Sequence, residues 1–342
     1  MTSSSLSQVK TYSFWYRYKR YIIPSVLATL LLIAIIIFYR LNPAVTQAVL
    51  ASTIRQSTPL ILGALCGILC ERAGIVNIGI EGQMLLSAWT AYMMNVWSGN
   101  LLLSVIVGAL TGALLGMLLA FTSVTLKLNQ IIGGTVINIL ALGLTGFLYQ
   151  TGMTTKGKLQ PIPLGGLADI PLVGPVLFNN PPITYTAIAL VFLLQIYLFM
   201  TPWGLRTRSV GEHPRAADTL GINVFRTRYI NTIVGGAIAG LAGAFLTLEA
   251  VGSFERGMTN GRGFVALAVM IFGKWNPIGA WLAALLFGFA NAMQTQFQFM
   301  GTFDIPHQFI GIIPYVLTII VVSGFVGRSR PPAAEGEPYE KE

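Results

Sequence analysis

Residues 101–126 read L-L-L-S-V-I-V-G-A-L-T-G-A-L-L-G-M-L-L-A-F-T-S-V-T-L, and no charged side chain interrupts them. A helix needs about 20 mainly apolar residues to cross the roughly 30 Å hydrocarbon core of a bilayer, because each residue adds about 1.5 Å. The run is therefore long enough to cross a membrane as a single helix.

The composition of the whole chain agrees with this membrane assignment. Of 342 residues, 54% are hydrophobic and only 10% are charged, whereas a soluble domain carries about 25% charged residues. The sequence predicts an all-α, polytopic membrane protein of about ten transmembrane helices, with interrupted helices among them. Spans 56–70 and 263–273 are short for a full crossing. The expected spans are 21–39, 56–70, 75–97, 101–126, 131–151, 183–200, 229–252, 263–273, 277–297 and 308–327.

The distribution of basic residues predicts the orientation. With both termini cytoplasmic, 15 of the 21 Lys and Arg residues fall inside and six outside, as the positive-inside rule expects. Arg40, Lys156 and Lys158 lie on the outer side, where this rule describes the loops imperfectly. The net charge of +9 is placed at helix ends and short loops, and no basic stripe interleaved with aromatics indicates nucleic-acid binding.

The chain then divides into three parts. Residues 1–20 form a basic cytoplasmic arm, 21–327 the transmembrane domain, and 328–342 a polar, proline-rich cytoplasmic tail that we expect to be disordered. Within the domain, 152–182 is an outer loop with six prolines and 203–228 is a cytoplasmic loop. The protein is expected in the cytoplasmic membrane as a multi-pass protein in contact with lipid.

Glycines recur every four residues in two of the expected spans. Gly108, Gly112 and Gly116 share one helix face, and Gly236 and Gly240 share another. Small residues at this spacing let helix backbones approach closely in lipid. Helix packing is the simplest interpretation of both faces.

The segment E-R-A-G-I-V-N-I-G-I-E-G-Q, residues 71–83, breaks the apolar pattern. It brings Asn77, Glu81 and Gln83 to the start of a membrane span, where an ionisable group is costly unless it faces protein or water. Its three glycines weaken regular helix, and a broken helix offers backbone groups to a solute. Two interpretations stay open: these side chains line a translocation path, or they form a structural hydrogen-bond network.

A second interrupted segment, residues 255–277, reads E-R-G-M-T-N-G-R-G-F-V-A-L-A-V-M-I-F-G-K-W-N-P. A short apolar stretch lies between Gly261 and Gly263 on one side and Gly273 on the other. The two interrupted segments occupy corresponding places in the two halves of the chain, which in repeat-built transporters points to a central pathway.

A third segment is cytoplasmic, G-E-H-P-R-A-A-D-T-L-G-I-N at residues 211–223. Pro214 suits the first turn of a helix and Gly221 its end. The sequence predicts a short helix between two spans, which is either a docking element or an ordinary solvated connection.

Enzymatic and metal-binding functions find little support in the sequence. The chain contains no G-x-x-x-x-G-K-[ST] phosphate loop and no H-E-x-x-H motif, and its two histidines, His213 and His307, are far apart. Cys66 and Cys70 are interpreted as small packing residues, because no histidine or further cysteine lies near them. We expect a transport protein with no cofactor of its own.

Three segments together resemble a known family. Residues 71–88, 211–223 and 261–280 resemble permease subunits of ABC importers, in the group that carries branched-chain amino acids, ribose and related sugars, and nucleosides. The chain looks most similar to the nucleoside (simple sugar) branch, whose members carry an E-R-x-G-x-x-N-I-G-x-E-G stretch. The resemblance covers roughly residues 55–325.

The resemblance implies a set of partners. The permease would work with an ABC ATPase subunit that binds ATP and Mg²⁺, a second, similar permease chain, and an extracytoplasmic solute-binding protein. The 211–223 loop would contain the coupling helix that seats in a cleft of the ATPase. The coupling residues expected from this resemblance are Glu212, Pro214, Arg215, Ala216, Ala217, Asp218 and Gly221.

The resulting expectation is nucleoside import by alternating access. Polar groups for the base and ribose edges would come from Asn77, Glu81, Gln83 and Asn260, and Phe264 is a candidate for stacking, although such aromatics are more often core. Ribose, another simple sugar or a branched-chain amino acid stays open as the solute. An ion-coupled secondary carrier is the alternative from another class, although Glu81 is its one clearly mid-membrane acidic candidate.

Overall fold

The computed structural model describes residues 29, 33, 35–150, 152–300 and 329–341. Two compact units, Met1–Ala48 and Val49–Glu342, divide the chain. In the first, residues 35–41 are helical and α2 begins at its end. The second unit carries everything discussed below. The elements are α2 (Pro43–Arg72), α3 (Ile80–Ser98), α4 (Leu101–Ala120), the π-helix η1 (Phe121–Thr125), α5 (Gln130–Phe147), β1 (Ile162–Pro163), the 3₁₀ helix η2 (Gly165–Asp169), α6 (Val173–Leu177), β2 (Asn179–Asn180), α7 (Pro182–Met200), α8 (Pro202–Glu212), α9 (Pro214–Thr219), α10 (Val224–Ala244), the π-helix η3 (Phe245–Val251), α11 (Arg262–Phe272) and α12 (Pro277–Met300).

The described residues confirm an all-α fold with several membrane-spanning helices. Six helices are long and apolar enough to cross a bilayer: α2, α4 with η1, α5, α7, α10 with η3, and α12. The short helix α11 has 11 residues, as the short span 263–273 predicts. The expected span 308–327 and most of 21–39 lie outside the described residues.

Helix α2 is much longer than the predicted span 56–70 and runs through the interior of the second unit. Its membrane window is 89% buried inside the protein, against 28% for α4. A helix surrounded by protein need not be apolar at every turn, so Ser52, Arg55 and Gln56 are tolerated in it. These polar residues are the reason why hydropathy underestimated its length.

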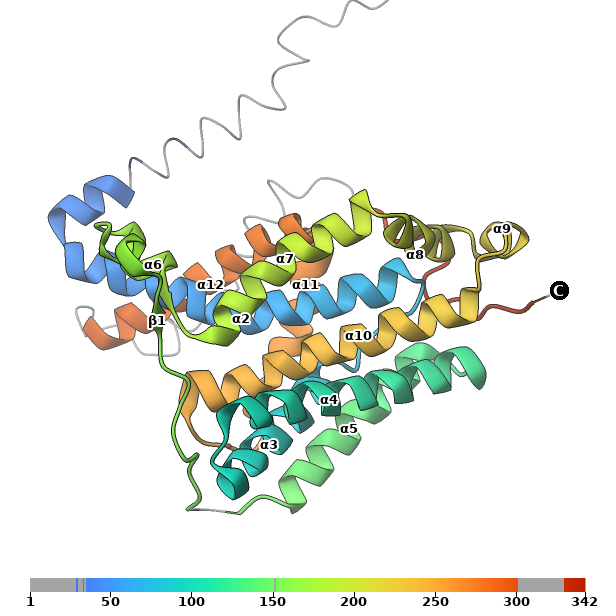
Figure 1. Ribbon diagram of the computed structural model, residues 1–342, viewed down its shortest axis with the longest axis horizontal. Coiled ribbons are helices and arrows are strands. Elements are labelled where there is room, and N and C mark those ends of the chain that lie inside the picture. The colour runs from blue at the N-terminus through green and yellow to red at the C-terminus, as the bar shows by residue number, and fades with distance from the viewer. Residues whose placement is uncertain (1–28, 30–32, 34, 151, 301–328, 342) are drawn as a thin grey trace, which may run out of the picture. The chain divides into compact units, whose positions relative to one another are not determined.

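Helices α4 and α10 lie alongside one another in backbone contact (Figure 1). A Cβ atom on Gly112 would overlap the carbonyl oxygen of Gly236 and lie 2.7 Å from the Cα of Gly240. A Cβ on Gly240 would in turn lie 2.8 Å from the Cα of Ala109. The two glycine faces therefore meet each other, which confirms their interpretation as packing surfaces.

The loop between α5 and α7 and the pair α8 and α9 lie at opposite ends of the second unit (Figure 1). The outer loop contains a two-stranded antiparallel sheet in which Ile162 is opposite Asn180. At the other end, Pro202 and Pro214 each occupy the first turn of a short helix. The predicted short helix in 211–223 is present as α9.

The C-terminal tail differs from its predicted disorder over residues 329–341. The backbone N–H of Ala334 donates to the Gly211 carbonyl (2.9 Å), and that of Gly336 donates to the Gly74 carbonyl (3.2 Å). Tyr339 is only 7% exposed. A polar, proline-rich segment lacks the apolar residues to fold alone, but here other elements supply its partners.

Candidate functional site

The two interrupted segments meet through Glu81, in the first turn of α3. Its carboxylate accepts hydrogen bonds from the backbone N–H groups of Gly261 (2.8 Å) and Gly263 (2.6 Å), at the start of α11. These N–H groups have no partner within their own helix, and the positive end of the helix dipole favours a carboxylate there. A Cβ on Gly263 would lie 2.5 Å from the backbone of Glu81, so glycine is needed for this approach.

Asn77 and Gln83 form a buried polar cluster under the same turn. The Asn77 amide donates to Gln83 Oε1 (3.1 Å) and to the thiols of Cys66 (3.3 Å) and Cys70 (3.5 Å). Both Asn77 and Gln83 are 0% exposed. Neither side chain lines the cavity described below. The contacts form a hydrogen-bond network at the break before α3, in which Asn77 Oδ1 and Gln83 Nε2 have no partner among the described residues.

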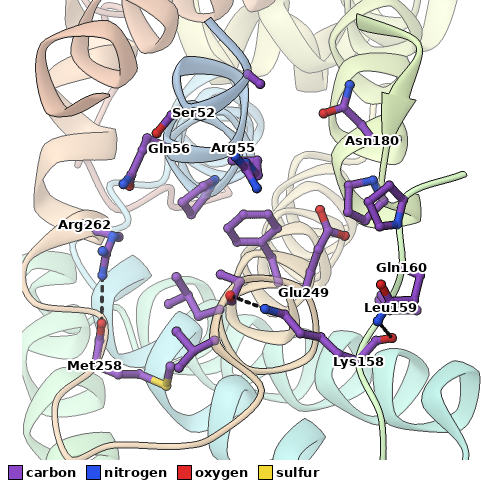
Figure 2. A pocket seen from close by; sticks show the side chains of 18 of the residues that line it. Ser52, Arg55, Gln56, Lys158, Leu159, Gln160, Asn180, Glu249, Met258 and Arg262 are labelled. Carbon is purple, nitrogen blue, oxygen red and sulfur yellow. Dashed lines mark hydrogen bonds between the residues drawn. The ribbon is translucent and has the colours of Figure 1, made fainter. Parts of the chain in front are cut away.

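A cavity of about 1160 Å³ opens in the half of the second unit that carries the outer loop (Figure 2). Four stretches line it: the N-terminal half of α2, the outer loop, η3 with its neighbours, and the segment before α11. Of the five residues predicted for a pathway, Asn260 is on this lining and Asn77, Glu81, Gln83 and Phe264 are not. The lining residues discussed below are Ser52, Arg55, Gln56, Pro59, Lys158, Gln160, Asn179, Asn180, Phe245, Glu249, Arg256, Asn260 and Arg262.

Helix α2 presents a polar face to this cavity. Ser52, Arg55 and Gln56 are three and four residues apart, so they share one side of the helix. Pro59 lies one turn further inside the helix and has no N–H, so the Arg55 carbonyl lacks its usual helical donor. A backbone acceptor is therefore left beside the cavity, as in interrupted transporter helices.

The π-helix η3 forms a second wall and places Phe245 and Glu249 toward the cavity. Single π turns inside α-helices are frequent at functional sites. The Glu249 carboxylate accepts from the Ile183 backbone N–H (2.9 Å) and from the Thr184 hydroxyl. Glu249 therefore also fixes the N-terminus of α7, where a carboxylate is favoured by the helix dipole.

Three of the four cations around the cavity are held by the protein itself. Lys158 donates to the Ala250 carbonyl (2.7 Å), near the C-terminal end of η3, and Arg262 donates to the Met258 carbonyl (2.8 Å). The guanidinium of Arg256 lies 5.1 Å from the Tyr149 ring centre. A cation near the last carbonyls of a helix is favourable, which accounts for Lys158 on the expected outer side.

What remains for a solute is mainly neutral hydrogen-bonding groups. Amides of Gln56, Gln160, Asn179 and Asn260 and the hydroxyl of Ser52 lie on the lining. Each amide offers both a donor and an acceptor. These groups can hydrogen-bond a polar solute, and the Arg55 guanidinium adds a positive charge to the same lining. The polar face of α2 was visible in the sequence at helical spacing, but the outer-loop contribution was not.

The opposite end carries the expected coupling loop. Ala217 of α9 is 2% exposed and packs with Val210 and Val224, whereas Ala216 faces outward and Leu220 is 82% exposed. Gly221 follows with φ of +81°, a conformation that favours glycine. The expected coupling residues are therefore divided between a buried and an exposed face.

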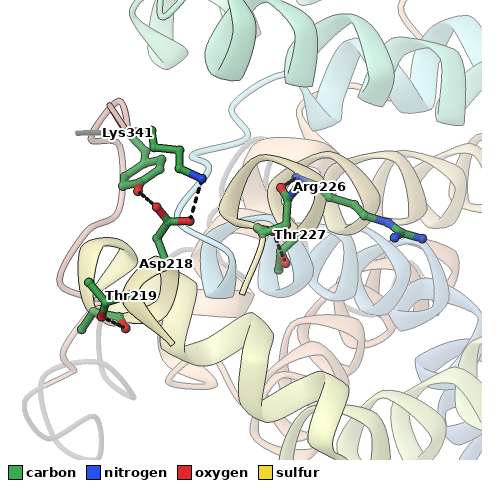
Figure 3. Close-up of polar contacts among 8 residues, drawn as sticks. Asp218, Thr219, Arg226, Thr227 and Lys341 are labelled. Atoms are coloured by element: carbon green, nitrogen blue, oxygen red, sulfur yellow. Dashed lines mark hydrogen bonds and ion pairs between the residues drawn. The ribbon is translucent and has the colours of Figure 1, made fainter. Parts of the chain in front are cut away.

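The acidic coupling residues contact the tail. Asp218 accepts a hydrogen bond from the Tyr339 hydroxyl (2.9 Å) and pairs with Lys341 (3.8 Å), as Figure 3 shows. Glu212 accepts from the backbone N–H of Ala333 (3.2 Å). The tail therefore reaches both α8 and α9.

Comparison with known proteins identifies the class. The family model described as "Branched-chain amino acid transport system / permease component" matches residues 49–322. The guanosine ABC transporter permease protein NupQ of Bacillus subtilis is 40% identical over 314 residues, covering 87% of this chain and 98% of NupQ. The nucleoside ABC transporter permease protein NupC of Lactococcus lactis is 40% identical over 310 residues, covering 86% and 97%.

A third relative has a sugar name. The putative glucose ABC transporter permease protein TsgC13 of Haloferax volcanii is 34% identical over 302 residues, covering 82% of this chain and 92% of TsgC13. No solved structure matches the chain. The family model covers most of the membrane domain, and the relatives match over nearly their whole length. The chain belongs to the branched-chain amino acid transport system permease family, and it is a permease subunit of an ABC transporter.

Proposed function

We propose that this permease imports nucleosides across the cytoplasmic membrane by alternating access, driven by ATP. The observation that carries the solute assignment is the cavity of about 1160 Å³ with neutral amides on its lining. A nucleoside is neutral and presents hydrogen-bond donors and acceptors on its base and ribose. The cavity is large enough to hold one, because small-molecule pockets are roughly 300–1,000 Å³. Two relatives at 40% identity bear nucleoside names.

The same proposal sets the topology. The chain is a multi-pass protein of the cell membrane; we place ten crossings in it and both termini in the cytoplasm. The cavity then opens toward the extracytoplasmic side, beside the outer loop. There it would receive solute from an extracytoplasmic binding protein.

The coupling end then faces an ABC ATPase. In this proposal α9 seats on that subunit, which binds ATP and Mg²⁺, since the chain has no phosphate loop of its own. A second, similar permease chain completes the pathway. ATP shifts the balance between outward- and inward-open states only if the ATPase contacts differ between them, and α9 is the element that would sense this difference.

The substrate assignment is tested by uptake in cells with and without this gene. Radiolabelled uridine, adenosine, guanosine, ribose, glucose and leucine are compared, with ATP depletion and an uncoupler as separate treatments. We expect deletion to abolish ATP-dependent nucleoside uptake. Intact nucleoside uptake would refute the nucleoside assignment, and uptake that follows the proton gradient instead of ATP would refute the importer.

A simple sugar is the second candidate solute. The relative with a glucose name is 34% identical, and amide side chains bind sugar hydroxyls as readily as ribose hydroxyls. Loss of ribose or glucose uptake on deletion, with nucleoside uptake unchanged, would select this alternative.

A further inference from the structure

The C-terminal tail contacts α8, the turn after α2 and the connection from α4 to α5. Ala334 is bound to the end of α8 at Gly211 (2.9 Å), and Gly336 is bound to the turn after α2 at Gly74 (3.2 Å). Glu340 pairs with Lys127 (2.7 Å), in the connection from α4 to α5. Residues 329–341 therefore tie together segments that are distant in sequence.

A buried arginine anchors the middle of the tail. Arg228, near the start of α10, is 1% exposed and donates Nη1–H to the Glu337 carbonyl (2.8 Å). Burying a guanidinium is costly unless it is hydrogen-bonded. The tail backbone supplies an acceptor for Nη1, while Nε and Nη2 have no partner among the described residues.

Tyr339 is the residue through which the tail reaches α9. Its ring packs with Val210, Ala217 and Val224, and its centre lies 5.5 Å from that of the Phe225 ring. Its hydroxyl donates to Asp218, on α9 itself (Figure 3). The side chain therefore joins α9 to the ends of α8 and α10 through both apolar contact and a hydrogen bond.

Helix α9 needs such support because it is short. It has six residues, and an isolated helix of this length is unstable in water. Its one buried residue, Ala217, contributes a single methyl group to the contact with the rest of the protein. Most of the apolar surface that can hold α9 in place comes from its neighbours and from Tyr339.

We propose that the tail is a brace that fixes α9 in its ATPase-facing position, with Tyr339 as the positioning residue. This rests on the proposed coupling role of α9. A movement of the ATPase reaches the membrane helices only if α9 is rigidly joined to them. Without Tyr339, α9 would yield under that movement, and ATP hydrolysis would continue with less transport.

The test uses the importer assembled with its ATPase in proteoliposomes, supplied with binding protein and with the solute that the uptake screen identifies. The measured quantity is ATP hydrolysed per solute moved. We expect Tyr339→Ala to raise this ratio at least about tenfold, a loss of about 1.4 kcal/mol of coupling. Tyr339→Phe keeps the ring and loses one hydrogen bond, so its ratio should rise about two- to tenfold.

Arg330→Gln is the matched control in the same tail. Its side chain is exposed and makes none of the tail contacts described above, so we expect the ratio of the unmodified protein. A stop codon at position 329 should reproduce Tyr339→Ala. An unchanged ratio in both Tyr339→Ala and the shortened chain would overturn the proposal, as would a parallel fall of uptake, hydrolysis and protein amount, which indicates mere misfolding.

Cross-linking tests the position of the tail independently of which solute is transported. The variants Glu212→Cys and Ala333→Cys should be joined by a short bismaleimide, because the Ala333 backbone N–H lies 3.2 Å from the Glu212 carboxylate, while the buried Cys66 and Cys70 give no background. Failure of the cross-link would overturn the brace even if nucleosides are carried. A cross-link in a protein that moves sugar in place of nucleoside would overturn only the substrate assignment.

Discussion

The carboxylate of Glu81 accepts a hydrogen bond of 2.6 Å from the backbone N–H of Gly263, 182 residues further along the chain. With the second bond from Gly261, it joins the start of α3 to the start of α11. The two breaks in the membrane helices are thus one structural unit, held by a single side chain.

Replacing Glu81 tests this junction. Glu81→Gln retains one acceptor oxygen and loses the charge, so we expect a loss of about 1.5–3 kcal/mol, the range for hydrogen bonds to charged groups. The measurement is the thermal unfolding midpoint in detergent, with Glu255→Gln, at an exposed position near the cavity, as control. A slower transport rate at unchanged stability would instead favour the interpretation that Glu81 lines the path.

The contact between α4 and α10 predicts a strong effect of one methyl group. Gly236→Ala places its Cβ 2.9 Å from the Cα of Gly116 and over the Gly112 carbonyl, so the helices must separate, at a cost of about 1–3 kcal/mol. Gly143→Ala on α5 meets nothing within 4 Å and should be neutral or slightly stabilising. Equal unfolding midpoints for the two variants would contradict the backbone contact.

The polar face of α2 should contribute to solute affinity. Gln56→Ala removes a donor and an acceptor from the cavity, and we expect KM for the transported nucleoside to rise about two- to tenfold, corresponding to one or two hydrogen bonds. Thr135→Ala is the control, because this exposed α5 hydroxyl donates to its own helix at Ile131. Uptake kinetics in cells with matched protein levels measure both. A changed maximal rate at unchanged KM would argue against binding at this face.

A substitution on the exposed side of the α9 segment should disrupt coupling without disturbing the fold. Leu220 is a large apolar side chain at 82% exposure directly after α9, where the proposed ATPase contact would bury it, so Leu220→Asp should reduce ATPase capture by the purified permease at least about tenfold, or about 1.4 kcal/mol. Ala217→Trp, at a buried position, should lower the unfolding midpoint as well. If Leu220→Asp retains normal capture and uptake, α9 does not seat on the ATPase.

Docking of the tail should weaken as pH rises. Burial raises the pKa of Glu335 above its ordinary value, beside the Glu71 carboxyl at the end of α2. A carboxyl whose pKa is raised by docking stabilises the docked tail at pH values below its ordinary pKa of about 4.3. This contribution is lost as pH rises through the raised pKa. The Lys127 ammonium, by contrast, lowers the pKa of Glu340. This exposed pair contributes in the opposite direction, and its contribution is lost only at acidic pH.

A spin label at Ala333→Cys measures this dependence without a titrating reporter. Its mobility should increase as pH is raised from about 4.3, the ordinary pKa of a glutamate carboxyl, and the buried Glu335 carboxyl ionises. Glu335→Gln should make the mobility nearly constant as pH is raised. A mobility that rises equally in the two proteins would assign the change to another group.

The sequence predicted most of the fold because membrane helices are recognised by their long hydrophobic runs. Spans 101–126, 183–200 and 277–297 match α4, α7 and α12 closely. The prediction fell short at α2, whose N-terminal half carries Arg55 and Gln56 against a cavity in place of lipid. It also differed at the tail, where proline and glutamate suggested disorder although Tyr339 is buried.

The candidate site was harder to predict than the fold. Asn77, Glu81 and Gln83 stand out in an apolar segment, but polarity at membrane depth indicates a structural hydrogen-bond network as readily as a solute site. Asn77 and Gln83 are in the network seen here. The residues that line the cavity come from four separate stretches, and the contribution of Asn179 and Gln160 depends on how the outer loop packs, which has no local signal.

The glycine contact between α4 and α10 also determines where the permease can bend. Two helices whose backbones touch cannot slide by a turn without driving a carbonyl oxygen into a Cα. They therefore move as one rigid body, together with α3, which packs on both. If the permease rocks as proposed, the movement takes place around this block, and α11 is tied to it through Glu81. Distance probes should therefore join the block to α7 and α12.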